Sequence, residues 1–306
     1  MDTTITMLKH SFEEQGYIAD HETMVTAFLA LQLQKPLLVE GPPGVGKTEI
    51  AKVIAKVFGT ELIRLQCYEG LDENKALYEW NYQKQLIKIQ LSQASRGGCA
   101  QEVEDSLFSE EYLLERPLLK AIRAEQKPVL LIDEIDKVDQ EFEAFLFEVL
   151  SDFQVSIPEW GTISARQIPI VVLTSNGERE LSDGLRRRCV YLYLDYPSPE
   201  KELRILTAKI PDLGQRLSLE VAQAVNFIRE RLELRKKPSI AETLDWARAL
   251  VALDADRLTP EVVNFSLNVI LKNKDDLDNF HQNMGTQDLL ELTANKGTDR
   301  KPGGRG

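Results

Sequence analysis

The sequence predicts a doubly wound α/β domain with a parallel sheet, followed by a smaller domain made only of helices. Short, continuously apolar runs alternate with helical patterns through the first two thirds of the chain, and only helical patterns follow Pro197. Such runs are typical of strands buried on both faces of a parallel sheet, and their alternation with helices is typical of doubly wound folds. We therefore expect an α/β domain over 1–195, a helical lid domain over 196–294 and a disordered, polar tail over 295–306.

Five apolar runs are the predicted strands of the sheet. They are Leu37–Val39, Leu62–Leu65, Val129–Ile132, Ile170–Leu173 and Val190–Leu194. Apolar residues at helical spacing predict a helix over Thr48–Phe58, which Gly59 ends. In the second domain, a hydroxyl residue followed by an acidic residue indicates the start of a helix. These starts are predicted at Ser198, Ser218, Ser239 and Thr259.

Composition excludes several classes of protein. The chain has 306 residues and a net charge of −12, which argues against nucleic acid as a partner because acidic proteins are repelled by phosphate. Its three cysteines, Cys67, Cys99 and Cys189, are scattered and predict neither a metal site nor a disulfide framework. The first residues lack the pattern of a secretory signal, and no run approaches the roughly 20 apolar residues of a membrane span. We expect a cytoplasmic protein without a membrane span.

A glycine-rich segment between the first predicted strand and the following helix fits the P-loop pattern. Its residues are Gly41, Pro42, Pro43, Gly44, Val45, Gly46, Lys47 and Thr48. Glycines let consecutive N–H groups point at phosphate oxygens, and the helix N-terminus adds the positive end of its dipole. Lys47 is expected to reach the β- and γ-phosphates and Thr48 to ligate Mg²⁺. A chance glycine-rich turn would not come with both the strand and the helix.

Two adjacent carboxylates follow the third predicted strand. Asp133 and Glu134 lie at the strand end, where ligands of parallel sheets bind. Asp133 is expected to hold Mg²⁺, as the Walker-B aspartate does, and Glu134 to polarise the attacking water. Glu134, as a second carboxylate at this position, favours an ATPase site that activates water over a site of the GTPase type. Asp136 is expected only to cap the next helix, and the run Asn273–Asp276, which superficially matches a guanine-reading motif, is interpreted as a solvated helix face.

Polar and basic residues follow the fourth strand. Asn176 comes at the strand end, where an amide can contact both a γ-phosphate and the lytic water. Three adjacent arginines, Arg186, Arg187 and Arg188, then precede Cys189 and the last strand. They are either a solvated basic turn or the source of an arginine finger, which donates positive charge to a phosphate held by a neighbouring subunit.

These segments together resemble the AAA+ superfamily of ATPases over roughly residues 15 to 290. The resemblance implies ATP and Mg²⁺ as ligands and gives Lys47, Thr48, Asp133, Glu134 and Asn176 the roles already described. It makes Arg188 the candidate finger, because this residue precedes Cys189, with Arg187 in reserve. Related proteins often carry a sensor-2 arginine early in a lid helix, whereas residues 239–243 contain none; Arg235 and Arg248 flank them.

Within the superfamily, the chain resembles the MoxR family. Ser156, Ile157 and Pro158 match that family's inserted hairpin. The segments 66–72, 76–82 and 241–246 resemble the branch found with maturation factors of molybdenum enzymes of the carbon-monoxide-dehydrogenase type. The resemblance implies a homo-oligomeric, hexameric ring that remodels a protein client, either a metalloenzyme precursor or a von Willebrand-type partner.

Three aromatic residues follow the second predicted strand. Tyr78, Trp80 and Tyr82 either pack in the core or grip a client polypeptide at the central pore of the ring. For the whole chain, the leading hypothesis is an ATPase chaperone. The alternatives are a DNA-directed motor or clamp-loader-like ATPase, and a nucleotide-gated scaffold with little hydrolysis. Intact Glu134 and Asn176 argue against the scaffold.

Overall fold

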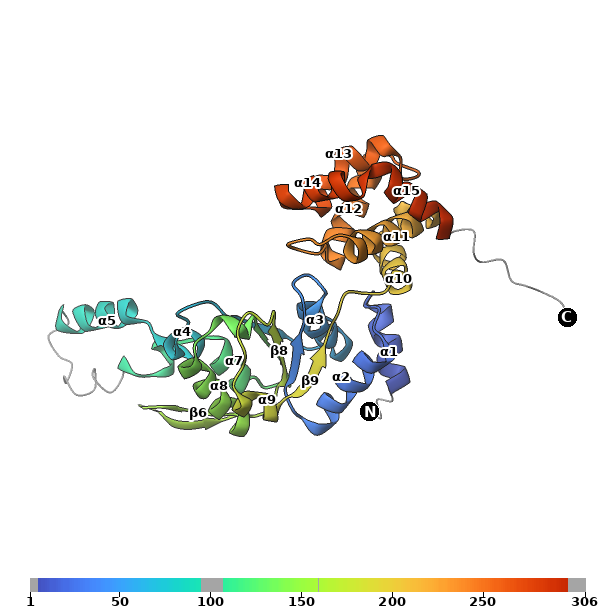
Figure 1. The fold of residues 1–306 in the computed structure, drawn as a ribbon. Helices are drawn as coiled ribbons and strands as arrows, with labels where there is room; N and C mark the ends of the chain where they lie inside the picture. Colours follow the sequence, from blue (N-terminus) through green and yellow to red (C-terminus); the bar gives the residue numbers. More distant parts are fainter. Residues whose placement is uncertain (1–4, 95–106, 159, 297–306) are drawn as a thin grey trace. The chain divides into compact units, whose positions relative to one another are not determined.

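The computed structural model describes residues 5–94, 107–158 and 160–296 of the chain (Figure 1). The chain divides into two compact units. Of the described residues, the first unit holds 5–9, 20–40, 48–94, 107–158 and 160–193, and the second holds 10–19, 41–47 and 194–296. The domain boundary predicted between residues 195 and 196 stays a prediction.

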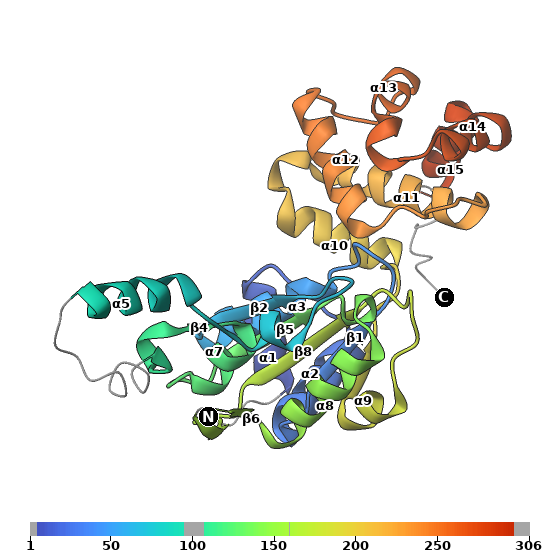
Figure 2. The ribbon, with the colours of Figure 1, turned by 90° about the vertical axis from the view of Figure 1, so that its left-hand side faces the viewer.

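A parallel sheet in the order β2-β5-β8-β1-β9 is the centre of the first unit (Figure 2). Its strands are β1 (Leu37–Glu40), β2 (Leu62–Gln66), β5 (Val129–Asp133), β8 (Ile170–Ser175) and β9 (Val190–Tyr193). The predicted strands and the α/β fold class are therefore confirmed. In this register Gln66 lies level with Asp133, and Glu40 lies level with Ser175, so the polar residues that end the strands meet at one edge of the sheet.

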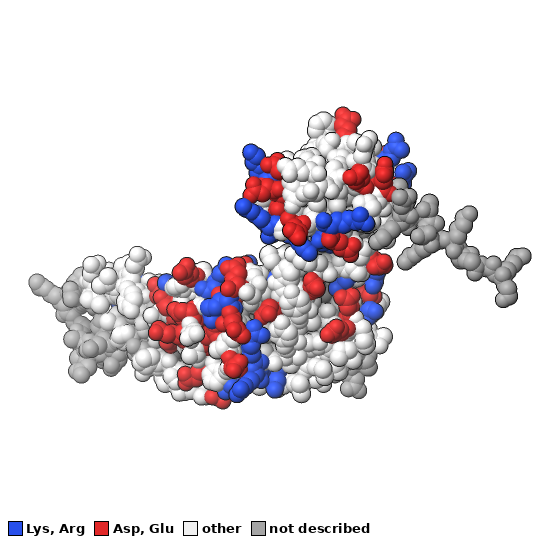
Figure 3. All heavy atoms as spheres, in the orientation of Figure 1, with Lys and Arg blue, Asp and Glu red and all other residues white. Residues whose placement is uncertain are grey.

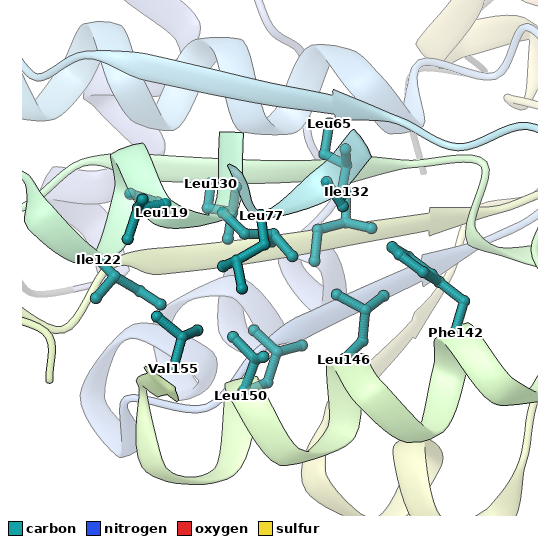
Figure 4. Packing of buried hydrophobic residues seen from close by; sticks show 14 of the residues in the cluster. Leu65, Leu77, Leu119, Ile122, Leu130, Ile132, Phe142, Leu146, Leu150 and Val155 are labelled. Atoms are coloured by element: carbon teal, nitrogen blue, oxygen red, sulfur yellow. The ribbon is translucent and has the colours of Figure 1, made fainter. Parts of the chain in front are cut away.

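Helices cover both faces of this sheet. All residues of β5 are buried, which requires packing on either side of the strand. Figure 4 shows one side, where Phe142, Leu146 and Leu150 point towards Leu130 and Ile132 of the strand. The helices that carry first-unit residues are α1 (Ile5–Glu14), α2 (His21–Leu33), α3 (Lys47–Phe58), α4 (Glu73–Ala76), α5 (Tyr82–Ala94), α7 (Pro117–Arg123), α8 (Gln140–Asp152) and α9 (Asp183–Arg188), with 3₁₀ turns η1 (Glu110–Tyr112) and η2 (Ile135–Lys137).

Two antiparallel strand pairs, apart from the main sheet, belong to the first unit. Strands β6 (Gln154–Ile157) and β7 (Gly161–Ser164) pair with each other, which confirms the hairpin predicted at Ser156. Strands β3 (Tyr78–Trp80) and β4 (Leu113–Glu115) form the other antiparallel pair, and α5 and η1 lie between them in the sequence.

The aromatic residues of this region divide between core and surface. Trp80 is buried and packs edge-on against Phe108 and Trp160, with ring centroids 5.3 and 6.1 Å away. Tyr78 packs on the same cluster, so core packing accounts for both residues. Tyr82 is exposed at the start of α5.

The helices of the second unit pack around Trp246, which is fully buried. They are α10 (Pro199–Lys209), η3 (Pro211–Leu213), α11 (Gln215–Arg231), α12 (Ile240–Ala252), α13 (Pro260–Ile270), α14 (Lys274–Asn283) and α15 (Gly285–Lys296). Ser198, Ser239 and Thr259 precede helices as predicted. The start predicted at Ser218 is wrong, because α11 begins at Gln215 and the Ser218 hydroxyl donates to the carbonyl of Gly214, 2.7 Å away.

Two other expectations concern the chain after residue 270. The run Asn273–Asp276 lies at the start of α14, away from the sheet strands, but Asp276 is not solvated: it is buried and accepts hydrogen bonds from the backbone N–H of Arg235 and from Asn273. Of the predicted tail, residues 295 and 296 end α15, and residues 297–306 lie outside the described part of the chain. Within that part, no helix has the length and apolarity needed to cross a bilayer.

Candidate functional site: phosphate loop and strand-end carboxylates

The glycine-rich segment forms a tight loop that connects β1 to α3. Gly44 has a φ of +80°, which side chains other than glycine rarely adopt. A Cβ at Gly44 would lie 2.2 Å from Oγ of Ser239, and one at Gly41 would lie 2.0 Å from the carbonyl oxygen of Leu194. The backbone therefore approaches its neighbours at distances that only glycine permits.

Lys47 lies inside this loop. It is buried, and its Nζ donates to the carbonyl oxygens of Gly41 and Pro42 at 2.7 and 2.8 Å. The ammonium group is thus held against the loop backbone at the N-terminus of α3, where unpaired N–H groups and the helix dipole favour an anion.

The residue after Lys47 joins the loop sequence to the strand-end carboxylates. Thr48 Oγ1 donates to Oδ1 of Asp133 at 3.0 Å, and Asp133 is buried. Thr174, on the adjacent strand β8, donates to the same Oδ1 at 2.5 Å. Its hydroxyl also accepts the backbone N–H of Glu134 at 2.9 Å. Thr174 therefore fixes both carboxylate residues, a role that sequence reasoning missed.

Strand β2 contributes two further contacts that sequence reasoning missed. Arg64 donates to Oδ2 of Asp133 from Nε at 3.0 Å and from Nη2 at 2.5 Å. Gln66 accepts from Arg64 and donates from Nε2 to Oε2 of Glu134 at 3.1 Å. The alternation of buried and exposed residues along β2 places both side chains on its exposed face, and the pairing of β2 with β5 sets them beside the carboxylates.

Glu134 is in a left-handed backbone conformation, with a φ of +58°. A non-glycine residue held there costs on the order of 1–3 kcal/mol and is a frequent feature of functional sites. The conformation ends β5 abruptly, and Glu134 is only partly buried while Asp133 is buried. Two neighbouring carboxylates thus have different surroundings, which permits different chemical roles.

The loop after β8 is anchored on Asp136. Oδ2 of this buried carboxylate accepts the backbone N–H groups of Asn176 and Glu178, each at 3.1 Å. The cap of α8 is Asp139, which accepts from the N–H of Phe142, so the expectation that Asp136 caps the next helix is wrong. Asp136 instead positions the loop that carries Asn176.

The oxygen atoms of Thr48 and Asp133 fit Mg²⁺, which prefers hard oxygen ligands and usually completes its shell with water and substrate phosphates. No group of three or more His, Cys, Asp or Glu side chains suited to holding a metal occurs within residues 5–94, 107–158 and 160–296. A magnesium ion bound together with a nucleotide is consistent with this donor set, because it needs only one or two protein oxygens.

Burial makes the two described cysteines poor nucleophiles. Burial and the carboxylates of Asp133, Asp136 and Glu134 raise the pKa of Cys67 to about 12. Burial likewise raises the pKa of Cys189 to about 12. Both thiols are protonated at neutral pH, so neither is a thiolate nucleophile or a ready metal ligand. Cys99 lies outside the described residues.

The three adjacent arginines have different surroundings. Arg186 pairs with Glu40 at 3.1 Å. Arg188 lies over the ring of Phe147, 3.5 Å from its centroid, and donates from Nε to Oγ of Ser151 at 2.6 Å. Arg187 is exposed and makes no hydrogen bond or ion pair with any residue that the structure describes.

In the second unit, the start of α12 contacts the phosphate loop. The backbone N–H of Ala241 donates to the carbonyl of Gly44 at 3.2 Å. Burial disfavours the charge of Glu242, but hydrogen bonds from Ser239 and Lys236 outweigh it and lower the pKa of this carboxyl. The two flanking arginines are paired with carboxylates of the second unit: Arg235 with Asp275 at 2.8 Å and Arg248 with Asp245 at 3.0 Å.

Comparison with known proteins assigns the chain to a family. Over 252 residues it is 23% identical to a protein of Staphylococcus saprophyticus described as uncharacterized, covering 78% of this chain and 84% of that protein. It is 28% identical over 148 residues to the chaperone protein ClpB of Bacillus cereus, and 30% identical over 142 residues to the Lon protease of Halothermothrix orenii. These two matches cover 47% and 44% of this chain, but only 14% of either relative.

Among solved structures, the RuvB Holliday junction branch migration motor of Thermotoga maritima is similar, with a TM-score of 0.46, 21% identity, and coverage of 92% of this chain and 83% of that one. The model of the family described as "ATPase family associated with various cellular activities" matches residues 37–194, more than half of the chain. The chain therefore belongs to the AAA family of ATPases.

Proposed function

We propose that this chain hydrolyses ATP with the help of Mg²⁺. The observation that carries the proposal is the 3.0 Å hydrogen bond between Thr48 and Asp133, which joins the last residue of the phosphate-loop motif to the first strand-end carboxylate. A nucleoside triphosphatase of this family needs a phosphate-binding loop, a hydroxyl group that ligates Mg²⁺ and a carboxylate at a strand end. The phosphate loop, Thr48 and Asp133 supply them. We infer the preference for ATP over GTP from the family and from Glu134, the second carboxylate, which follows Asp133 directly.

Each part has a proposed role. The N–H groups of residues 41–46 and the ammonium of Lys47 bind the phosphates, and Thr48 and Asp133 hold Mg²⁺. The metal supplies positive charge to the β- and γ-phosphates. Glu134 accepts a proton from the attacking water, and Asn176 orients that water and the γ-phosphate. The contacts of Thr174 and Asp136 support this proposal, because they fix the backbone on which Glu134 and Asn176 lie.

We further propose that the chain acts as a hexameric ring of the MoxR type, with residues 1–195 as the nucleotide-binding domain and residues 196–294 as the lid. In such a ring an arginine of one subunit stabilises the transferred phosphate in the next. Resemblance assigns this role to Arg188, and the exposure of Arg187 makes that residue the alternative. The confirmed hairpin β6–β7 supports the MoxR assignment.

We propose a protein client for this motor, in the cytoplasm, and specifically the maturation of a molybdenum enzyme or action on a von Willebrand-type partner. The names of two relatives, a chaperone and a protease, support work on proteins. On the face drawn in Figure 3, acidic and basic side chains are interspersed, which gives no support to a DNA-directed motor on that face. A nucleotide-gated scaffold is the other alternative.

Phosphate release and assembly mass, measured together, test the proposal. We expect hydrolysis of ATP that requires Mg²⁺ and rises as larger assemblies form. Asp133→Asn should lower hydrolysis by about 10²-fold or more, because the metal loses its charged ligand. Binding of ATP by the wild-type chain without turnover, even in the assembled state, would favour the scaffold.

A further inference from the structure

Arg64 occupies one oxygen of the carboxylate that is proposed to hold Mg²⁺. The guanidinium donates from Nε and Nη2 to Oδ2 of Asp133, at 3.0 and 2.5 Å, whereas the hydroxyls of Thr48 and Thr174 take Oδ1. Every carboxylate oxygen of Asp133 is thus engaged by the chain's own donors. The proposed metal ligand is already neutralised by a cation.

A guanidinium and a divalent cation compete for such an oxygen. The guanidinium has only donors and stays protonated, so it cannot become a metal ligand. A Mg²⁺ ion ligated at 2.0–2.1 Å by Asp133, or through one water, would bring two positive charges close to a third. If the guanidinium and Mg²⁺ both stayed on the carboxylate, they would repel each other. Displacement of one of them from the carboxylate removes this repulsion.

Arg64 is placed so that it can leave. Its side chain is 51% exposed, whereas that of Asp133 is 4% exposed. It lies on β2, one of the two edge strands of the sheet, and no further strand within the described residues pairs with β2 on that side. Arg64 also donates a hydrogen bond to Gln66, which is itself exposed. A side chain that is half in solvent loses little packing when it turns away.

We propose that Arg64 is a positioning residue that holds Asp133 in the metal-free protein and is displaced from Oδ2 when Mg²⁺ and nucleotide bind. This inference rests on the proposed function. Arg64 holds the buried carboxylate in its orientation without a metal, and the displacement of Arg64 lowers the affinity for Mg²⁺. Removal of Arg64 therefore tightens metal binding and weakens the metal-free fold.

Manganese binding tests the proposal without measurement of turnover. The full-length protein is titrated with Mn²⁺ in the presence of the non-hydrolysable analogue AMP-PNP, and free Mn²⁺ is followed by electron paramagnetic resonance. Arg64→Gln should bind Mn²⁺ about two- to fivefold more tightly than wild type, the range expected for a partly exposed ion pair. The matched control is Arg116→Gln, which removes the same charge from an arginine that is 44% exposed and paired with Glu79; its affinity should not change.

Thermal unfolding supplies a second readout. In EDTA the melting temperature of Arg64→Gln should lie a few degrees below that of wild type, because Asp133 loses its charged partner. Mn²⁺ with AMP-PNP should raise it by more than in wild type. If Arg64→Gln does not fold, Arg64→Lys takes its place; it keeps the charge but loses the two-pronged contact, so it should also bind Mn²⁺ more tightly than wild type.

An affinity equal to or weaker than that of wild type, with Arg116→Gln unchanged, would overturn the proposal, since Arg64 would then stay in place and assist the metal. That result would leave the proposed ATPase function intact. If the wild-type protein binds no Mn²⁺ with AMP-PNP at all, the proposed function itself fails. The two failures are thus distinguishable.

Discussion

Thr174 contacts both carboxylate residues through a single hydroxyl. Its hydroxyl donates to Asp133 and accepts the N–H of Glu134. Thr174→Val therefore removes both hydrogen bonds, while the valine side chain keeps nearly the shape of threonine. We expect phosphate release to fall about 10- to 100-fold and stability to fall by about 1–3 kcal/mol, because buried polar groups lose their partners. Steady-state hydrolysis and urea unfolding measure the two effects.

Thr174→Ser is the matched control, because it keeps the hydroxyl and loses one methyl group. Its hydrolysis should stay within about threefold of wild type. Equal losses in the serine and valine variants would mean that packing, and not the hydrogen bonds, sets the contribution of Thr174.

The cysteines give a prediction about pH. The pKa values of Cys67 and Cys189 are raised to about 12, so at pH 8 only about one thiol in ten thousand is ionised. In a Cys99→Ser background, alkylation by iodoacetamide should be slow at pH 8 until the protein is unfolded. Mass spectrometry of the modified chain measures it, and rapid labelling of Cys67 in the folded protein would contradict the raised pKa.

At the residue scale, sequence could predict the site only where the chemistry is local. Lys47 and Thr48 follow from one contiguous motif, and Asp133 and Glu134 from the end of one apolar run. Arg64 and Thr174 reach Asp133 from the two strands that flank β5, and no motif marks strand order. Once the order is known, the register is informative: Ile132 pairs with Leu173, so the next residues, Asp133 and Thr174, are neighbours.

At the scale of elements, the loop before α3 depends on the start of α12. A Cβ on Gly44 would lie 2.2 Å from Oγ of Ser239 and 2.9 Å from its Cβ. Gly44→Ala should therefore displace the loop from its conformation and weaken binding of a fluorescent ATP analogue by about tenfold or more. Equilibrium titration measures the affinity.

Gly59→Ala is the control for backbone strain. Gly59 also has a positive φ, +62°, but apart from its neighbours in the chain no atom of the described residues lies within 4 Å of a Cβ built there. Both variants should lose about 1–2 kcal/mol of stability from the left-handed conformation, and only Gly44→Ala should lose nucleotide affinity. A similar loss of affinity in both would attribute the effect to strain alone.

Sequence patterns located the elements better than their ends. Continuous apolar runs identified β1, β5 and β8, because strands buried on both faces have no polar side, whereas β2 alternates buried and exposed residues. Ser218 was misplaced as a helix start because a hydroxyl followed by an acid also occurs inside a first turn. The preceding Gly214, with a φ of +74°, begins the turn into α11 and was the better signal.

At the scale of the whole molecule, the arginines before β9 test the proposed ring. The finger variant should bind ATP and assemble, yet hydrolyse about 10³-fold more slowly. Arg188→Ala also loses the contacts with Phe147 and Ser151 and should unfold at a lower temperature, whereas Arg187→Ala should not. The finger is the residue whose variant loses hydrolysis without loss of assembly.

Mixing establishes whether that arginine acts between subunits. A finger variant and Glu134→Gln are each inactive alone, but a mixed ring contains sites with an intact Glu134 and an intact neighbouring arginine. Hydrolysis should partly recover in the mixture. No recovery, with mixed assemblies present by native mass spectrometry, would contradict action in trans.

The central claim is that Glu134 activates water in a site that binds ATP through the phosphate loop. The most direct measurement is a comparison of ATP affinity and single-turnover hydrolysis in wild type and Glu134→Gln. We predict an affinity within about threefold of wild type and hydrolysis slower by about 10²- to 10⁴-fold, because the amide cannot accept the proton. Hydrolysis by Glu134→Gln at the wild-type rate would show that Glu134 does not activate the attacking water.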